Sequence, residues 1–350
     1  MKFLSLQHID IEDPGTFKDY LLADGHEITT IQLDQGDMIP TNLDSYDAML
    51  CMGGPMDTFM ENEYPWLIEE KKAISEYVLN LKKPFLGFCL GCQLLGEVLG
   101  GKVVESVPPE IGVLDIDIET NAKDDLIFNF LPEKIKALQW HSYEVIGLDN
   151  NSKIKVIGTS PSTKYQIFGY ENYAYGVQFH LEIRKTTVDD WAKVPEYKNA
   201  LEKSLGADAL PQMKDMVDKE IDTMMQQCNQ MYKNFVNIIN TYKKLKPYAY
   251  KCDFARYCIL FKQGGWYFDL GLKVVKSIEL EETIISASAQ LAEEISGSFS
   301  APSASFSTRI TDLKTDSGSF STRVTNLKTD SGSFSTRTVS YTHLRAHETV

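Results

Sequence analysis

The chain has 350 residues, a net charge of −14 and an apolar share of 43%, which is enough for a substantial buried core. The acidic balance argues against nucleic acid or an anionic membrane surface as the main partner. Six cysteines are too few for a disulfide scaffold, and residues 1–13 lack the long apolar core of a signal peptide. No apolar run approaches the roughly 20 residues of a membrane span. We therefore expect a soluble protein of a reducing, cytoplasmic compartment.

The first 185 residues alternate short apolar runs with amphipathic stretches. Strands are expected at residues 2–9, 26–33, 46–54 and 84–89, and helices at residues 15–25 and 66–83. This alternation predicts an α/β fold with a doubly wound, mostly parallel sheet of the flavodoxin-like type. Later strand-like runs have little helix between them and predict further, partly antiparallel strands at residues 111–119, 135–148, 154–160 and 173–180.

The last part of the chain changes character twice. Residues 186–245 show a helical pattern, and their methionines recur at near-helical spacing, which predicts packing against the sheet. After Gly297 the composition shifts to Ser, Thr and Gly with an internal repeat, which predicts a disordered low-complexity tail at residues 297–350. We interpret residues 339–349 as an adapter-like sequencing artefact, so its two histidines are not expected to bind metal.

Two cysteines lie close together in the stretch GFCLGCQLLGEVLGG, Gly87 to Gly101. Only Cys89 has glycine two residues before and two residues after it, a frame typical of a nucleophile on a tight strand-to-helix turn. At a helix N-terminus the dipole and free N–H groups favour a thiolate. We expect Cys92 to be a small buried residue. A redox pair is an alternative, whereas a zinc site lacks a second Cys/His pair at ligand spacing.

A nucleophilic cysteine needs a base, and the base needs an orienting group. His180 follows a strand-like run, and Glu182 stands two residues later, so both side chains share one face of an extended segment. His8 and His26 lie near expected strands and have no obvious partner in the sequence. These patterns favour Cys89, His180 and Glu182 as a catalytic triad.

Three separated motifs carry a family resemblance: MGGPMD at 52–57, GFCLGCQ at 87–93 and GVQFHLE at 176–182. Together they resemble the class I glutamine amidotransferases, and the free-standing GMP-synthase-like domains in particular, over about residues 1–240. The resemblance implies that Cys89 attacks the side-chain amide of glutamine, His180 moves a proton to ammonia and Glu182 holds the imidazole. It also implies an oxyanion hole made by backbone N–H groups of Gly53, Gly54 and Leu90, and a glutamine pocket lined by Gln93, His141 and Ser142.

The expected function is therefore hydrolysis of glutamine to glutamate and ammonia through a Cys89 thioester, without a cofactor or a metal. The sequence shows no Gly-rich phosphate loop of a synthetase, so a separate synthetase subunit is the expected ammonia acceptor, if there is one. A γ-glutamyl-peptide or γ-glutamyl-amine hydrolase on the same triad is an alternative. A non-catalytic domain that has kept the fold is another.

A second resemblance covers Cys252 to Ile278, which is similar to the sugar-nucleotide-binding segment of DXD-type glycosyltransferases. The matching residues are Asp253, Arg256, Gly264, Gly265, Tyr267 and Asp269. Gly271 stands where the second acidic residue is expected, and a single carboxylate is a poor anchor for a divalent metal. We therefore predict a glycosyltransferase-like fragment at residues 246–280, with glycosyltransferase activity as a minority alternative.

Overall fold

The structure is a computed structural model that describes residues 1–122 and 125–263. The chain divides into two compact units, residues 1–245 and residues 246–350. Residues 264–280 of the expected glycosyltransferase-like fragment and the expected tail at 297–350 lie outside the described residues. The first unit carries all of the expected amidotransferase residues.

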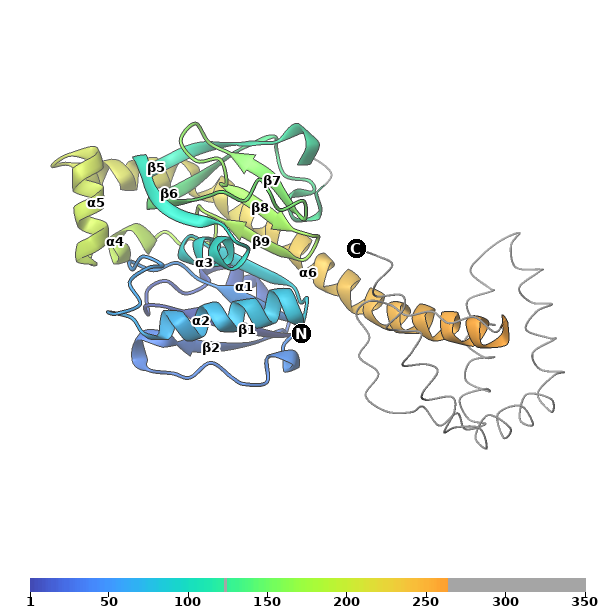
Figure 1. Ribbon diagram of the computed structural model, residues 1–350. Helices are drawn as coiled ribbons and strands as arrows, with labels where there is room; N and C mark the ends of the chain where they lie inside the picture. The colour runs from blue at the N-terminus through green and yellow to red at the C-terminus, as the bar shows by residue number, and fades with distance from the viewer. Residues whose placement is uncertain (123–124, 264–350) are drawn as a thin grey trace. The chain divides into compact units, whose positions relative to one another are not determined.

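The first unit is built on a mixed sheet of nine strands in the order β2-β1-β3-β4-β9-β8-β7-β5-β6 (Figure 1). The strands are β1 Lys2–Gln7, β2 Glu27–Gln32, β3 Ala48–Cys51, β4 Phe85–Phe88, β5 Lys102–Ile118, β6 Lys134–Ile146, β7 Ile154–Thr159, β8 Ile167–Tyr170 and β9 Ala174–Val177. Neighbours from β2 to β9 pair in parallel, and the pairs from β9 to β6 are antiparallel. The expected α/β fold with additional antiparallel strands is confirmed; β8 is a strand that the sequence patterns did not single out.

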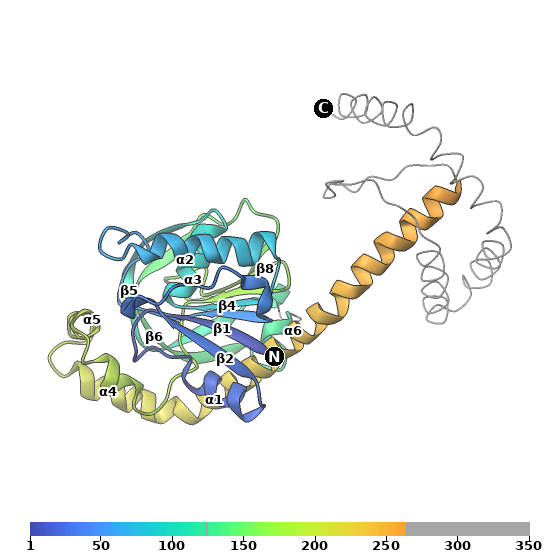
Figure 2. The ribbon, with the colours of Figure 1, turned by 90° about the horizontal axis from the view of Figure 1, so that it is seen from below.

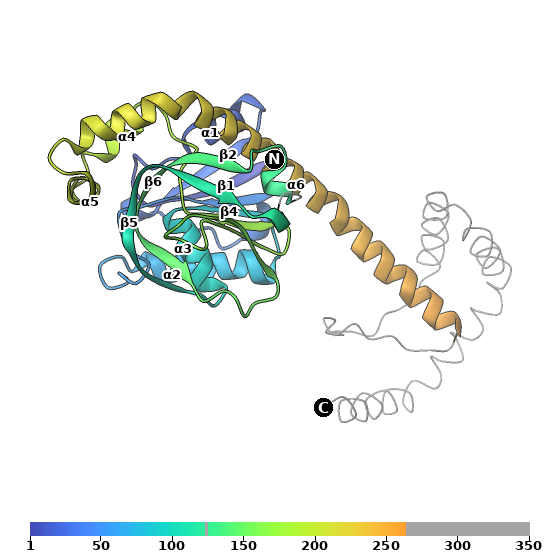
Figure 3. The same cartoon turned by 90° about the horizontal axis from the view of Figure 1, so that it is seen from above.

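Helices cover both faces of the sheet, as the views in Figure 2 and Figure 3 show. The helices are α1 Gly15–Ala23, α2 Trp66–Ser75 with a π-helical continuation Glu76–Asn80, α3 Leu90–Val98, α4 Thr187–Trp191, α5 Pro195–Leu205 and α6 Ala209–Gln263. Successive side chains of a strand point to opposite faces, and on β1 Phe3 and Leu4 enter two different cores. Phe3 packs in the core that α1 and α6 cover, and Leu4 in the core that α2 and α3 cover.

The methionines of α6 serve the core. Met213, Met224 and Met231 are fully buried in the same cluster as Phe3, which confirms the packing role that their spacing predicts. None of the helices in the described part of the chain has the length and apolar content that a membrane span requires.

The parallel half of the sheet determines where the site forms. Strands β1, β3, β4 and β9 run in the same direction, so their carboxyl ends meet at one edge. In open α/β sheets ligands bind outside this edge. The residues that leave these strands include His8, Gly53, Cys89 and His180.

Candidate active site

Cys89 lies on a strained turn between β4 and α3. Its φ of +47° and ψ of −102° fall outside the regions that non-glycine residues ordinarily adopt, and such strain is typical of functional turns. The flanking glycines are required by close backbone approach. A Cβ on Gly87 would lie 2.9 Å from the amide nitrogen of Cys92, and one on Gly91 would lie 2.6 Å from the carbonyl carbon of Cys51. Neighbouring backbone therefore excludes side chains at both positions, as the glycine frame predicts.

His180 and Glu182 form a buried pair beside this turn. His180 Nδ1 lies 2.6 Å from Glu182 Oε1, and the two side chains are 2% and 4% exposed. Burial alone would lower the pKa of His180, but the Glu182 carboxylate and hydrogen bonding to Cys89 raise it well above its usual range. The Trp191 ring contacts the imidazole edge-on, with centroids 4.6 Å apart. The imidazole is therefore held in place and favoured in its protonated form.

The Gly53–Gly54 turn lies against the same imidazole. A Cβ on Gly53 would lie 3.2 Å from His180 Cε1, and one on Gly54 would lie 3.0 Å from the Leu90 side chain. Within the described part of the chain, the backbone N–H groups of Gly53, Gly54 and Leu90 donate no hydrogen bond. Three free donors next to a cysteine and a histidine are what an oxyanion hole requires.

Of the expected glutamine-pocket residues, Gln93 connects to Cys89 through Gln178. Gln178 Nε2 donates to Cys89 Sγ at 3.6 Å, and Gln93 Nε2 lies 3.3 Å from Gln178 Oε1 and 3.0 Å from the carbonyl oxygen of Tyr143. His141 Nδ1 donates to that same carbonyl at 2.9 Å, and its Nε2 lies 3.2 Å from Glu110 Oε2. Ser142 is half-buried on β6 next to His141. The Gln93 side chain is thus one hydrogen-bond partner away from the Cys89 thiol, and His141 meets Gln93 at the Tyr143 carbonyl.

Glu12 is a buried acid beside the site that the sequence patterns did not single out. Its carboxylate fills the space where a side chain at Gly53 would go, and it accepts a hydrogen bond from the Tyr197 hydroxyl. Burial raises the pKa of Glu12, while the nearby His180 acts in the opposite direction. Glu12 stands among other acids in the sequence DIEDPG, and nothing in that stretch marks it.

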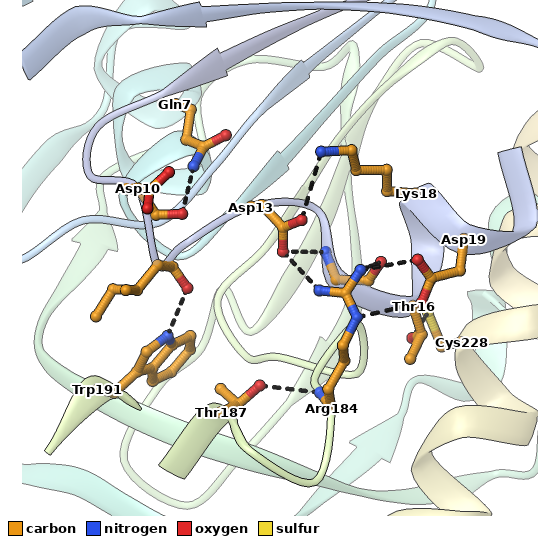
Figure 4. Close-up of polar contacts among 12 residues, drawn as sticks. Gln7, Asp10, Asp13, Thr16, Lys18, Asp19, Arg184, Thr187, Trp191 and Cys228 are labelled. Atoms are coloured by element: carbon orange, nitrogen blue, oxygen red, sulfur yellow. Dashed lines mark hydrogen bonds and ion pairs between the residues drawn. The ribbon is translucent and has the colours of Figure 1, made fainter. Parts of the chain in front are cut away.

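Arg184 fastens the segment between β1 and α1 to the chain after β9 (Figure 4). Its guanidinium pairs with Asp13 at 2.8 Å and with Asp19 at 2.8 Å, and it also donates to the carbonyl oxygen of Gly15 at 2.8 Å. Such a forked donor set suits planar carboxylate recognition. The segment between β1 and α1 is therefore tied to the chain that follows Glu182.

Two interpretations of single residues are settled by the packing. Cys92 is fully buried, and its Sγ would lie 3.0 Å from a Cβ on Gly176 of β9. It therefore packs as a small core residue, as expected, and Cys89 and Cys92 are both free thiols. The sequence shows no obvious partner for His8, and the structure supplies two. Its ring nitrogens contact Glu70 and the carbonyl oxygen of Gly53, because the tertiary fold brings α2 and β3 to the end of β1.

The second resemblance falls on a helix and on the region beyond it. Asp253 and Arg256 belong to α6, whereas Gly264, Gly265, Tyr267, Asp269 and Gly271 lie outside the described residues. A family model for the glycosyltransferase sugar-binding region containing the DXD motif matches residues 184–290. This match covers less than a third of the chain and supports the recognition of a glycosyltransferase-like sequence.

Known relatives agree with the first resemblance. The chain is 33% identical to a subunit of the glutamine-hydrolysing GMP synthase of Sulfurisphaera tokodaii, over 41% of this chain and 71% of the relative. It is 35% identical to the corresponding subunit from Ignicoccus hospitalis, over 46% of this chain and 79% of the relative. With the glutamine amidotransferase-like protein YfeJ of Salmonella typhimurium it shares 29% identity, over 52% of this chain and 76% of the relative.

Solved structures share the fold. The crystal structure of a glutamine amidotransferase from Thermotoga maritima matches with a TM-score of 0.60 and 26% identity, over 67% of this chain and 98% of that chain. A glutamine amidotransferase from Methylobacillus flagellatus matches with a TM-score of 0.59 and 22% identity, over 68% and 94%, and supports the fold alone. The family model for class-I glutamine amidotransferases matches residues 16–191, half of the chain and the part that holds the Cys89–His180–Glu182 site: the chain belongs to the class I glutamine amidotransferase family.

Proposed function

We propose that this protein hydrolyses the side-chain amide of glutamine, with Cys89 as nucleophile, His180 as general acid and base, and Glu182 as the group that orients His180. The observation that carries the proposal is the 2.6 Å contact between His180 Nδ1 and Glu182 Oε1 next to a cysteine on a strained elbow. The raised pKa of His180 supports an imidazolium that can give its proton to the departing ammonia.

The reaction proceeds in two halves. The Cys89 thiolate attacks the amide carbon, and the oxygen of the tetrahedral intermediate is held by the N–H groups of Gly53, Gly54 and Leu90. His180 gives its proton to the amide nitrogen, the C–N bond breaks, and ammonia leaves a thioester on Cys89. Neutral His180 then takes a proton from water, which attacks the thioester; the C–S bond breaks and releases glutamate. Each oxyanion donor typically stabilises the transition state by about 2.7–4 kcal/mol.

Ammonia release from glutamine tests this proposal directly. We expect release by the wild type and none by Cys89→Ala, with Cys92→Ala as the matched cysteine control that remains active. A diazoketone analogue of glutamine should label Cys89, and peptide mapping identifies the modified residue. Equal ammonia release by wild type and Cys89→Ala contradicts the proposal, and so does labelling at Cys92.

The same assay decides the substrate. Glutamine, a γ-glutamyl peptide and a γ-glutamyl amine carry the same acyl group and differ only in the leaving amine. We expect the highest kcat/KM for glutamine. A preference for the larger leaving groups would assign the triad to a γ-glutamyl hydrolase instead.

We also propose that a separate synthetase subunit takes up the ammonia. The support is that two relatives are named as subunits of a glutamine-hydrolysing GMP synthase. We expect the catalytically dead Cys89→Ala protein to co-purify a synthetase-type ATP-using protein from its native extract as efficiently as wild type does. Glutaminase activity without any such associated subunit would limit the protein to hydrolysis.

The glycosyltransferase-like match raises a second candidate activity, nucleotide-sugar transfer by the C-terminal segment, which the sequence itself disfavours. Its support is the family-model match over residues 184–290. Calorimetric titration of the full chain with a nucleotide sugar and Mn²⁺ tests it. Because Gly271 replaces an expected acidic ligand, we expect no manganese-dependent binding.

A further inference from the structure

His8 belongs to a fully buried polar cluster that the proposed mechanism does not use. Its Nε2 lies 2.9 Å and 3.1 Å from the two carboxylate oxygens of Glu70, and Cys51 Sγ donates to Glu70 Oε1 at 3.3 Å. His8, Cys51 and Glu70 are each 0% exposed, and the Trp66 ring stacks on the imidazole with centroids 5.4 Å apart. Burying a charged pair costs free energy unless its geometry is good. We therefore expect the His8–Glu70 pair to have a function at this edge of the sheet.

The other ring nitrogen reaches the expected oxyanion turn. His8 Nδ1 lies 2.8 Å from the carbonyl oxygen of Gly53. A carbonyl oxygen only accepts hydrogen bonds, so Nδ1 carries a proton. Nε2 and the Glu70 carboxylate then share a second proton. Burial alone would lower the pKa of His8, but the charge and hydrogen bond of Glu70 outweigh this and raise it. His8 is thus a fixed donor toward Gly53.

The direction of one peptide group decides whether the oxyanion hole includes the Gly54 N–H. In a trans peptide the C=O of one residue and the N–H of the next point in opposite directions. With the Gly53 carbonyl turned to His8, the Gly54 N–H points away from His8. Leu90 and His180 flank this turn, and the Gly54 N–H donates to no other group among the described residues.

Two consecutive glycines leave this peptide without a steric preference. Side chains are excluded there, because a Cβ on Gly53 would overlap Glu12 and one on Gly54 would lie 3.0 Å from His8 Cβ. Glycine also populates backbone conformations that other residues avoid, so a Gly-Gly peptide turns over at little cost. An external hydrogen bond is needed to hold one orientation.

We propose that His8 is a positioning residue that acts through the Gly53 carbonyl to hold the Gly53–Gly54 peptide with its N–H facing the reacting carbonyl of the substrate. Glu70 holds the imidazole and Cys51 donates to Glu70, while Arg184 ties down Asp13 in the loop between β1 and α1 (Figure 4). The inference rests on the proposed glutaminase function and deepens it.

The cluster also has the composition of a metal site, but its geometry favours a hydrogen-bond network. Its three donor atoms lie within 4.8 Å of one another. A structural zinc site uses four ligands, and the described residues supply three here. Each donor already has a hydrogen-bond partner, so the network is complete without an ion.

Two substitutions of His8 separate the proposal from a packing role. His8→Asn keeps an N–H donor near the Nδ1 position and loses the contact with Glu70. His8→Gln keeps a polar group near the Nε2 position and loses the contact with Gly53. We expect kcat of His8→Gln to fall about 10²–10³-fold, the loss typical of one oxyanion donor, and that of His8→Asn to fall less. His26→Ala is the matched histidine control and should retain the wild-type rate.

Alkylation of Cys89 by iodoacetamide distinguishes positioning from packing, because a His8 variant that only damaged the packing would also slow this reaction. This reaction displaces iodide at a saturated carbon and forms no oxyanion, so it reports the thiolate and His180 alone. We expect unchanged alkylation rates in both His8 variants. Parallel loss of alkylation and kcat would mean a disturbed triad and would overturn the proposal, as would equal kcat losses for His8→Asn and His8→Gln.

A crystal structure of His8→Gln gives a test that does not depend on turnover. We expect the Gly53 carbonyl to leave its present orientation or to occupy two. A carbonyl that stays in place refutes the positioning role even if the wild type proves inactive on glutamine. A wild-type protein that releases no ammonia from glutamine would refute the proposed glutaminase function, independently of the result for His8→Gln.

Discussion

Replacing Glu182 with glutamine separates the charge of this side chain from its ability to accept a hydrogen bond. In the structure Glu182 Oε1 lies 2.6 Å from His180 Nδ1, and both side chains are buried. Two unit charges about 4 Å apart interact by about 4 kcal/mol at an effective dielectric constant of about 20. The glutamine amide oxygen can still accept from Nδ1–H, so the charge is what is lost. An energy of this size corresponds to about 10³ in rate, and we expect kcat to fall about 10²–10³-fold.

The assay is ammonia release from glutamine across pH, together with the pH dependence of Cys89 alkylation. Glu182 raises the pKa of His180, so in the wild type the imidazolium persists to higher pH than in free histidine. Without the carboxylate the imidazolium deprotonates at lower pH, so the alkaline limb of ammonia release moves to lower pH, whereas alkylation, which needs only the thiolate, does not fall there. Glu202→Gln, an exposed glutamate of α5, is the control. A Glu182→Gln enzyme with the wild-type rate and an unmoved alkaline limb would refute a catalytic role for the Glu182 charge.

The remaining predictions concern the groups around the triad. Cys92→Ala should keep full ammonia release and lose about 1 kcal/mol of unfolding free energy in urea; loss of activity would revive a redox pair. Glu70→Ala leaves buried His8 without its counter-charge and should cost about 3–5 kcal/mol of unfolding free energy, whereas a loss near zero would deny the ion pair. Burial raises the pKa of Asp57 to about 6, so native stability falls as pH rises from about 4 through about 6. After discounting for its half-exposed position, Asp57→Asn should stabilise the protein by about 1 kcal/mol at pH 7 and by nothing at pH 4 in thermal melts.

The sequence predicts the parts of this molecule whose local pattern and tertiary role coincide. A buried strand at residues 84–89 runs into a turn that requires glycine at positions 87 and 91. The sequence motif therefore predicts the geometry of the turn directly. The pair His180 and Glu182 is predictable for a similar reason, because side chains two positions apart in an extended segment point to the same face. The sequence patterns did not predict β8, because this strand has only four residues, all of them buried, and pairs with antiparallel neighbours on both sides.

Residues that support the site from a distance leave no such trace. Glu12 stands among other acids, and His8 and Glu70 are 62 residues apart. These side chains are brought to the site by the parallel pairing of β1 with β3 and by the packing of α2 on that face. A period of two or of 3.6 residues predicts which face is buried; it does not predict which residue of another element lies opposite.

The Gly53–Gly54 turn shows why the supporting residues are needed. The proposed mechanism requires backbone N–H groups that no side chain obstructs. Glycine leaves them unobstructed, but its backbone flexibility does not fix the orientation of the peptide group. Local sequence therefore supplies an unobstructed donor, and only the fold supplies its direction. His8 gives that direction through one hydrogen bond to Gly53, while Glu12 occupies the space that the missing side chain leaves. The nucleophile depends on its own turn for its geometry, whereas the oxyanion donor depends on a buried pair that reaches it from β1 and α2.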